Sequence, residues 1–454
     1  MAKRKSSFII THNRTQQLRL LFAVVFSLLI CGVTPSIAAQ DDLAFSGLIK
    51  KKLALSLTDT RFEKSDITIE PELNYGLSPV SQLTLKGRLR LGLIDRLEPG
   101  QPTARNRADI SGRWLVGDRL EFELREAFLD TEIGDSFLRL GKQQIVWGQA
   151  DGLKVLDILN PQSFREFILE DYEDSRIPLW SVNAEIPIHD YTLQLVWIPD
   201  TTYHDIPARG SRYAPRWHAI APPIATDRPV TQHSYAKPDN PFKDSDIGLR
   251  LSRTLGRWDL SLNYAYHYDD SPVVRRHVTE GGTQISQTYE RTHLLGGSYS
   301  TAFGNFVLRG EVGYATDRYF STDQTSENHG VHQSDLFSTV IGLDYAGLTD
   351  WFISAQYFQD QLITNHTALL RDRVQRTATL LVRRNFMNER LQAEALVIKN
   401  LHQNDGQIQM AVKYEWQDSL WLHLGADLFF GEINSLHGQF RHHDRLTVGI
   451  EFGF

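Results

Sequence analysis

The final ten residues, RLTVGIEFGF, alternate without interruption between apolar side chains and polar or small ones. Successive side chains of an extended strand point to opposite faces, so Leu446, Val448, Ile450, Phe452 and Phe454 share one face. Chain ends are usually polar and poorly ordered. A terminal strand with an aromatic last residue therefore predicts that the end of this chain is built into a sheet.

The same alternation recurs over ten or more residues at 257–270, 407–416 and 418–430. Strands of soluble proteins usually run about 5–6 residues. Aromatic residues near strand ends, such as Trp258 and Trp416, are typical of membrane interfaces. A soluble sandwich also alternates, but length and aromatic placement favour an all-β fold, a transmembrane antiparallel β-barrel.

Eighteen segments fit this pattern, and their connections alternate between tight and long, as in bacterial barrels with even strand numbers. We therefore predict about 18 strands; 16 remains open, and the weakly alternating segment 107–117 is assigned to an outer loop. The predicted strands are 44–58, 64–77, 81–94, 119–131, 135–148, 178–187, 190–199, 245–254, 257–270, 288–302, 304–317, 334–346, 349–362, 374–385, 389–402, 407–416, 418–430 and 444–454.

Residues 1–39 have the pattern of a removable secretory signal peptide. Basic residues precede an apolar or small run at 20–33, and small residues follow up to a predicted cut after Ala38 or Ala39. A membrane-spanning helix needs about 20 apolar residues. We therefore expect residues 40–454 to form a single barrel in the outer membrane of a Gram-negative-type cell, with the N-terminus in the periplasm. Phe452 and Phe454 would be the signal read by the barrel-assembly machinery, and lipids and lipopolysaccharide would surround the wall.

The net charge is −7, and loss of five basic and no acidic residues with the signal makes it −12. This charge argues against nucleic acid as a partner. The single cysteine, Cys31, lies in the predicted signal, so the mature chain has neither disulfides nor thiolate chemistry. No cofactor is predicted.

Charged side chains of both signs fall on the predicted inward faces. They brace the wall of the lumen, or they form a basic track of Lys86, Arg88 and Arg90 that selects solutes as charged rings do in other pores. The predicted lumen and solute contacts are Lys86, Arg88, Arg90, Glu121, Glu123, Arg125, Arg309 and Glu311.

The long connection 149–177 differs from the strands. Ser163 and Glu166 have capping-box spacing, and apolar residues then recur at helical intervals. We predict a short amphipathic helix that folds inward as a constriction; an exposed lid is the alternative. The acidic run at 170–174 lacks the spacing of a calcium loop, so no metal is predicted, and the run is expected to be solvated or paired with Arg176. The predicted constriction residues are Lys154, Asp157, Phe164, Arg165, Phe167, Glu170 and Asp171.

The second long connection, 200–244, is rich in proline and carries Tyr203, Tyr213, Trp217 and Tyr235. Two readings remain open: a stiff aromatic surface that binds ligands, or an ordered cap on the barrel mouth.

One stretch resembles a known family. LGKQQIVWGQADGLKVLDILNPQSFREFILEDYEDSRIPLW (140–180), followed by LQLVWIPD (193–200), is similar to bacterial outer-membrane proteins catalogued only as a domain of unknown function. Outside 140–200 the similarity rests on the strand pattern, and the loops here are shorter. The resemblance implies a β-barrel channel or transporter for hydrophobic or lipid-like cargo, with an inner-membrane exporter of the resistance-nodulation-division type and a periplasmic carrier as partners. It implies no catalytic residues.

The sequence thus predicts an outer-membrane channel that passes small or amphipathic solutes, and not an enzyme. Two alternatives remain, a barrel hydrolase and a structural or surface-binding barrel without transport. The G-x-S-x-G and H-E-x-x-H patterns of common hydrolases do not occur in the sequence.

Overall fold

The computed structural model describes residues 43–100, 106–150, 152–224, 229–232, 237–325 and 329–454. The predicted signal peptide, 1–39, lies outside these ranges. No helix within them is both long and apolar enough to cross a membrane. The barrel unit, residues 44–454, is described below.

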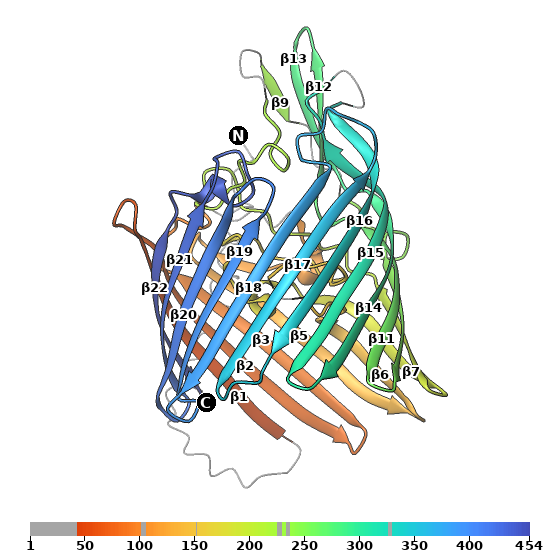
Figure 1. Cartoon of the computed structure of the whole chain (residues 1–454), viewed down its shortest axis with the longest axis vertical. Helices are drawn as coiled ribbons and strands as arrows, with labels where there is room; N and C mark the ends of the chain where they lie inside the picture. The colour runs from red at the N-terminus through yellow and green to blue at the C-terminus, as the bar shows by residue number, and fades with distance from the viewer. Residues whose placement is uncertain (1–42, 101–105, 151, 225–228, 233–236, 326–328) are drawn as a thin grey trace, which may run out of the picture. The chain divides into compact units, whose positions relative to one another are not determined.

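Eighteen antiparallel strands form one closed ring (Figure 1). Each predicted segment overlaps one of them, so the prediction of 18 strands is confirmed and 16 is excluded. The strands are β1 (Leu43–Ser56), β2 (Phe62–Ser78), β3 (Ser81–Gly92), β5 (Leu120–Ile133), β6 (Ser136–Gln143), β7 (Leu179–Ile188), β8 (Tyr191–Ile198), β10 (Asp246–Leu255), β11 (Trp258–Tyr268), β14 (Arg291–Phe303), β15 (Phe306–Ser321), β16 (Val331–Tyr345), β17 (Trp351–Ile363), β18 (Val374–Phe386), β19 (Leu391–Asn400), β20 (Gly406–Gln417), β21 (Leu420–Phe430) and β22 (Arg445–Gly453).

The last strand closes the ring on the first. β22 pairs with β1 from Leu48↔Gly453 to Ser56↔Arg445. The final residue takes part, because Gly47 and Phe454 exchange two backbone hydrogen bonds of 3.0 Å. The uninterrupted alternation at the end of the sequence therefore reflects a strand that leaves no open edge.

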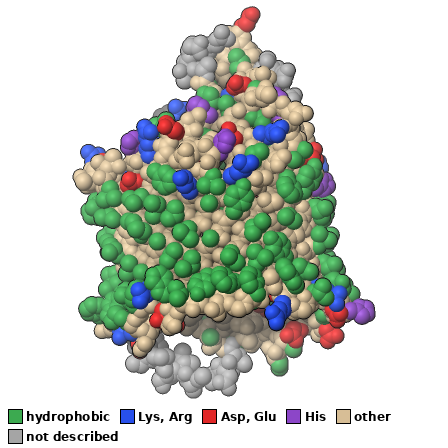
Figure 2. Space-filling view, viewed as in Figure 1, with side chains coloured by type: hydrophobic (Ala, Val, Ile, Leu, Met, Phe, Trp, Pro, Cys, Tyr) green, Lys and Arg blue, Asp and Glu red, His purple; other side chains and the backbone are tan. Residues whose placement is uncertain are grey.

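The apolar faces of the strands form the outer surface of the barrel. Leu262, Ile341 and Leu424 are each more than half exposed on it. On the face seen in Figure 2, apolar side chains form a belt across the middle of the barrel, with charged side chains gathered above and below. This distribution suits a wall whose middle lies in hydrocarbon and whose rims lie in water.

Connections alternate as predicted. At the end where the C-terminus lies (Figure 1), turns of two to five residues join the strands, such as 134–135, 256–257 and 346–350. Gly134 and Gly256 adopt φ of 62° and 64° there, a left-handed conformation that favours glycine. All the longest connections lie at the other end. That the tight turns face the periplasm stays a prediction.

The long connections hold the remaining elements. They are η2 (Asp109–Ser111) and β4 (Trp114–Val116), α2 (Tyr172–Ser175), the small sheet of β9 (Val230–Gln232), β12 (Val273–Thr279) and β13 (Gly282–Thr288), and η3 (Gly438–Phe440). Segment 107–117 thus contains a three-residue strand, β4, which pairs with β5 alone among the described residues and stays outside the ring.

We predict that Leu424→Arg destabilises the barrel in bilayers by about 2–4 kcal/mol, because it places a charge on the lipid-facing side of β21. The neighbouring substitution His423→Arg places its charge in the lumen and should change the free energy of unfolding little. Urea unfolding in liposomes compares the two variants. Equal losses of stability would contradict the assignment of faces.

Candidate functional site

Between β6 and β7 the chain leaves the wall and packs against inward-facing side chains of the barrel. Residues 144–150 and 152–178 are called the inner segment. The predicted amphipathic helix is wrong: the one α-helix among its described residues is α2, four residues long. Phe167 has a left-handed φ of 57°, and an isolated bridge joins Gln162 to Arg176. The Glu166 side chain caps no helix, because Lys64 and Arg445 bind it.

One side of the inner segment packs on an apolar inner wall. Trp147 and Leu156 are almost fully buried there. Two wall glycines allow the close approach: a Cβ on Gly248 would lie 2.8 Å from the Trp147 ring, and one on Gly296 would lie 2.3 Å from Leu156. The cluster comprises Ile145, Trp147, Val155, Leu156 and Leu159 of the inner segment with Leu179, Val196, Ile198, Ala265, Leu294, Ala315, Leu336, Val340, Phe358 and Leu362 of the strands.

Glu311 of β15 holds the beginning of the inner segment. Its carboxylate accepts the backbone N–H groups of Gln149, Ala150 (3.1 Å) and Leu156 (3.0 Å). Arg309 donates to the backbone carbonyl of Gln149 and pairs with Asp344 at 3.0 Å. These two predicted lumen contacts therefore bind the chain itself.

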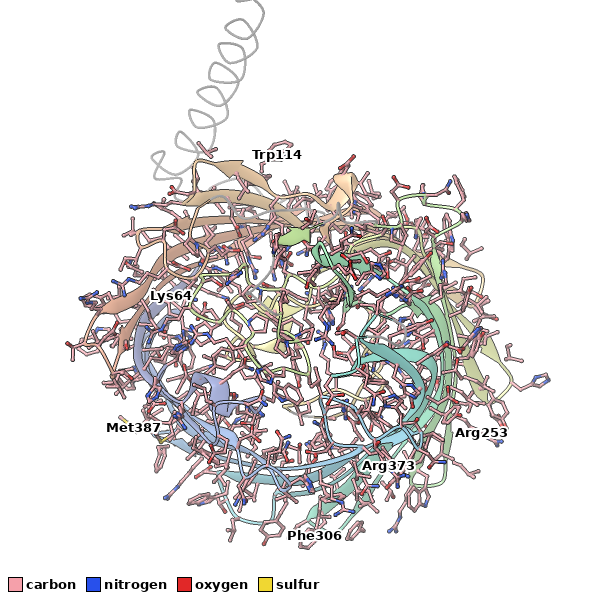
Figure 3. The ribbon with its side chains drawn as sticks, turned by 90° about the horizontal axis from the view of Figure 1, so that it is seen from above. Lys64, Trp114, Arg253, Phe306, Arg373 and Met387 are labelled. Atoms are coloured by element: carbon pink, nitrogen blue, oxygen red, sulfur yellow. The ribbon has the colours of Figure 1, made fainter. Side chains whose placement is uncertain are left out.

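The opposite side of the inner segment is held by buried ion pairs. Arg445 has no exposed surface and contacts three carboxylates: Asp427 at 2.7 Å, Glu166 at 2.7 Å and Glu63 at 3.3 Å. Lys64 is the second cation on Glu166. Figure 3, which looks along the barrel, shows Lys64 and Phe306, the latter at the outer rim.

Arg165 extends this network to the loop after β3. It pairs with Asp66 at 2.9 Å and with Glu98 at 3.0 Å. Glu98 is also bound by Arg90 and Arg113. Burial disfavours the charged form of Glu98, but the nearby guanidinium groups outweigh burial and lower its pKa to about 2.

The predicted basic track is neutralised. Arg88 pairs with Glu70 at 2.5 Å and with Asp174 of the inner segment at 2.6 Å. Lys86 lies 3.6 Å from Glu173, and Arg90 pairs with Glu121 as well as Glu98. The acidic run therefore pairs with the wall.

Of the two expectations for this run, solvation or pairing with Arg176, the pairing is wrong. Arg176 binds Asp157 at 2.6 Å, and Lys154 binds the same carboxylate at 2.7 Å. Asp171 is exposed, whereas Glu170 lies 3.9 Å from Lys64.

A bulge in β5 sets the remaining predicted contacts. Register shifts opposite Lys86 and Gly87, so Arg125 is the extra residue of β5. Arg125 lies 3.6 Å from Glu123 and donates to the backbone carbonyl of Arg176 at 2.9 Å. Glu123 also binds Arg107 at 2.7 Å.

Aromatic residues of the other long connection are buried, which supports the cap and not the ligand surface. Tyr203 stacks on Tyr289 with ring centroids 3.7 Å apart. Tyr213 packs on Phe440, which also contacts Phe167 of the inner segment at 4.8 Å. Trp217 is buried too. Tyr235 lies outside the described residues. Phe164 meets the His204 ring edge-on at 5.0 Å.

Some lumen charges remain without an ion-pair partner among the residues that the structure describes. By strand register, Lys52, Arg250 and Lys413 face inward, as do Glu185 and Glu415. The wall that remains open to solutes thus offers both signs of charge. No group of three side chains suited to a metal ion occurs within the described ranges.

Sequence reasoning missed the residues that hold the inner segment from the wall: Glu63, Lys64, Asp66, Asp427 and Arg445. Their alternation indicated an inward orientation, but it carried no sign of which loop they would meet. The apolar inner wall was also missed, because an apolar residue on an inward face contradicts the simple alternating pattern.

Closed topology, an apolar outer belt and a charged, partly filled lumen define an outer-membrane β-barrel of porin-like architecture. The chain belongs to the family described as "Protein of unknown function (DUF1302)", whose profile matches residues 117–370, more than half of its length. Among curated proteins, none matches the chain.

Solved structures with a similar fold include OccAB1 of Acinetobacter baumannii, with 8% identity and a TM-score of 0.51 over 92% of this chain and 97% of that one. OccK2 (OpdF) of Pseudomonas aeruginosa, in complex with glucuronate, has 11% identity and a TM-score of 0.51 over 91% and 98%. OpdK of the same organism, with vanillate, has 9% identity and a TM-score of 0.50 over 91% and 99%. At these identities the similarity concerns the fold.

We predict that Arg445→Met releases the inner segment from the wall. It leaves three carboxylates without their shared cation, a change that costs about 3–5 kcal/mol for a buried pair. Thermal unfolding should begin at lower temperature, and protease should cut within 152–178. The matched control, Arg253→Met, removes the pair with Asp190 of an exposed turn and should change neither measurement. Arg253 is labelled at the outer edge of the barrel in Figure 3.

We predict that acid loosens the inner segment only at low pH. The folded pKa of Glu98, about 2, lies below its ordinary value of 4.5, so its stabilising contribution is present above 4.5 and is lost as the pH falls toward 2. Protease protection of 152–178 should be constant between about pH 7 and pH 5 and decline below about pH 4.5. Glu98→Gln should be less protected at neutral pH. Loss of half of this protection near pH 6.5 would instead indicate that a histidine controls the release of the inner segment.

Proposed function

We propose that this protein is a channel that passes small or amphipathic solutes passively across the outer membrane. One observation carries the proposal: a closed wall surrounds a lumen that is partly filled by the inner segment, whose side chains are held to the wall by ion pairs. Arg165 and Lys154, which we expected to contact solutes, are taken up by carboxylates of the protein. In this proposal the unpaired charges of Lys52, Arg250 and Lys413 line the path that remains.

Two structures of similar fold support the size class of the solute. They hold glucuronate and vanillate, which are small organic acids. We extend to this chain only the expectation that solutes of such size enter the lumen. A barrel with 18 strands has room for an aqueous passage where loops leave it open.

We predict weak charge selectivity in the native channel. Arg88 and Arg90 are neutralised by buried carboxylates, and unpaired charges of both signs remain. Glu70→Gln would leave Arg88 and Lys50 sharing only Asp174, so the reversal potential in a salt gradient should shift toward anion preference. Asp190→Asn, at an exposed turn, is the control and should show no shift. An unchanged potential in Glu70→Gln would contradict the role assigned to these pairs.

The family resemblance supports a finer proposal, in which a periplasmic carrier and an inner-membrane exporter deliver apolar cargo to the barrel. Liposome swelling with a graded panel of sugars, organic acids and amphiphiles tests transport itself. If small solutes enter the liposomes and larger ones do not, the result supports a channel. If amphiphiles enter as well, the result also supports the proposal of apolar cargo. Liposomes that stay impermeable to every solute, with Arg445→Met equally closed, would overturn the channel and favour a structural barrel.

A further inference from the structure

The hydrogen-bonded wall is interrupted on one side of β5. β6 pairs with β5 only from Ala127↔Lys142 to Ile133↔Ser136, because the chain turns into the lumen after Gln143. β4 pairs with β5 at Leu120–Phe122. Residues 123–126 therefore have no ladder partner on this side among the described residues. Asn160 bridges the two departing chains, since its side chain accepts the Ile145 N–H at 2.7 Å and donates to the Ile177 carbonyl at 2.8 Å.

A short stretch crosses this interruption. Residues 106–116, called the strap, begin beside the connection that follows β8, where Arg107 pairs with Asp205 at 2.6 Å, and end at β4. Midway, the Trp180 indole N–H donates to the Ile110 carbonyl at 3.0 Å. The strap has apolar residues on its outer side: Trp114 is 67% exposed and Ile110 60%. In Figure 3 Trp114 lies at the outer rim of the barrel.

Lys142 lies at this interruption. By register it is opposite Ala127 and Trp180, in line with Leu140 on the lipid-facing side of β6, yet it is only 1% exposed. Among the described residues, none forms a hydrogen bond or ion pair with its ammonium group. A buried cation without a partner is costly.

Carboxylates near Lys142 are already engaged. Glu123 is shared by Arg107 and Arg125. Asp200 accepts the Thr202 hydroxyl at 2.6 Å, the Ser111 hydroxyl and the Trp180 backbone N–H at 3.1 Å. Neither carboxylate forms a hydrogen bond or ion pair with Lys142, so its buried ammonium group has no direct anionic partner among the described residues.

We propose that the interruption is a lateral binding site for an amphipathic acid. Lys142 takes the carboxylate or phosphate head, and the tail lies toward the bilayer along Trp114 and the exposed Leu124 of β5. The ligand is either a membrane lipid or an amphiphile that moves between lumen and bilayer. Binding at this site does not require transport through the lumen, so it is tested separately from the channel.

The test uses the full-length protein in nanodiscs and measures binding of palmitate and of hexadecanol, which share a tail and differ in the head. Palmitate should bind about tenfold or more tightly than hexadecanol, as expected for one charge-assisted contact. Lys142→Met should reduce palmitate affinity to that of hexadecanol, whereas Lys142→Arg retains it. Trp114→Ala should weaken both ligands. Lys399→Met, an exposed lysine on β19, is the control and should change neither.

The site would be overturned if Lys142→Met bound palmitate as tightly as the unsubstituted protein does. Both proteins must be folded, which is checked by the change in their gel mobility on heating. Equal affinity for palmitate and hexadecanol would also overturn the site. Mass spectrometry of lipids that co-purify separates the two sources. A phospholipid or lipid A lost from Lys142→Met identifies a membrane lipid, whereas palmitate binding without such a lipid identifies a mobile amphiphile. Conductance of Lys142→Met reports on the channel independently.

Discussion

Backbone hydrogen bonding in hydrocarbon is the constraint on which this structure depends. Each N–H and C=O of a spanning strand must find a partner within the protein, and only a closed sheet supplies one for all strands. Closure is made by β1 and β22 and reaches the last residue, Phe454. Gly47 permits it, because a Cβ there would lie 2.6 Å from the Phe454 ring. The apolar outer belt and the polar lumen follow from closure, since each strand then has one face toward lipid and one toward the interior.

Inside the ring, the inner segment fills space between two unlike walls. β8, β11 and β14–β17 present an apolar surface that would be poorly solvated if left bare, and Trp147 and Leu156 cover it. β1–β3 and β22 present charges that find partners in Glu166, Arg165 and Asp174. Such buried pairs add little net stability, but the loss of one partner is costly. They therefore fix the position of the segment more than they strengthen the barrel.

The sequence predicted the strands well and the interior poorly, for one physical reason. Orientation of a strand residue follows from its neighbours at i±2, so the alternation of 418–430 identified both faces of β21. Partners inside the lumen lie far apart in sequence: Glu166 and Arg445 are separated by 279 residues. The spacing after Ser163 predicted a helix that does not form, because Glu166 binds Lys64 and Arg445 of the wall instead of capping a local turn. Arg88 pairs with Asp174 of the inner segment, 86 residues away, and the sequence around Arg88 carried no signal of that partner.

Site-directed spin labelling along β21 tests the central claim most directly, since the predicted mature chain lacks cysteine and accepts single labels cleanly. In bilayers, labels at 422, 424 and 426 should be relaxed by oxygen, which is dissolved in lipid. Labels at 423 and 425 should be relaxed by a water-soluble nickel complex. An accessibility that alternates with period two in these opposite senses is the predicted result. The same accessibility at odd and even positions, or the reverse assignment, would contradict a barrel with a lipid-facing apolar wall and a wet lumen.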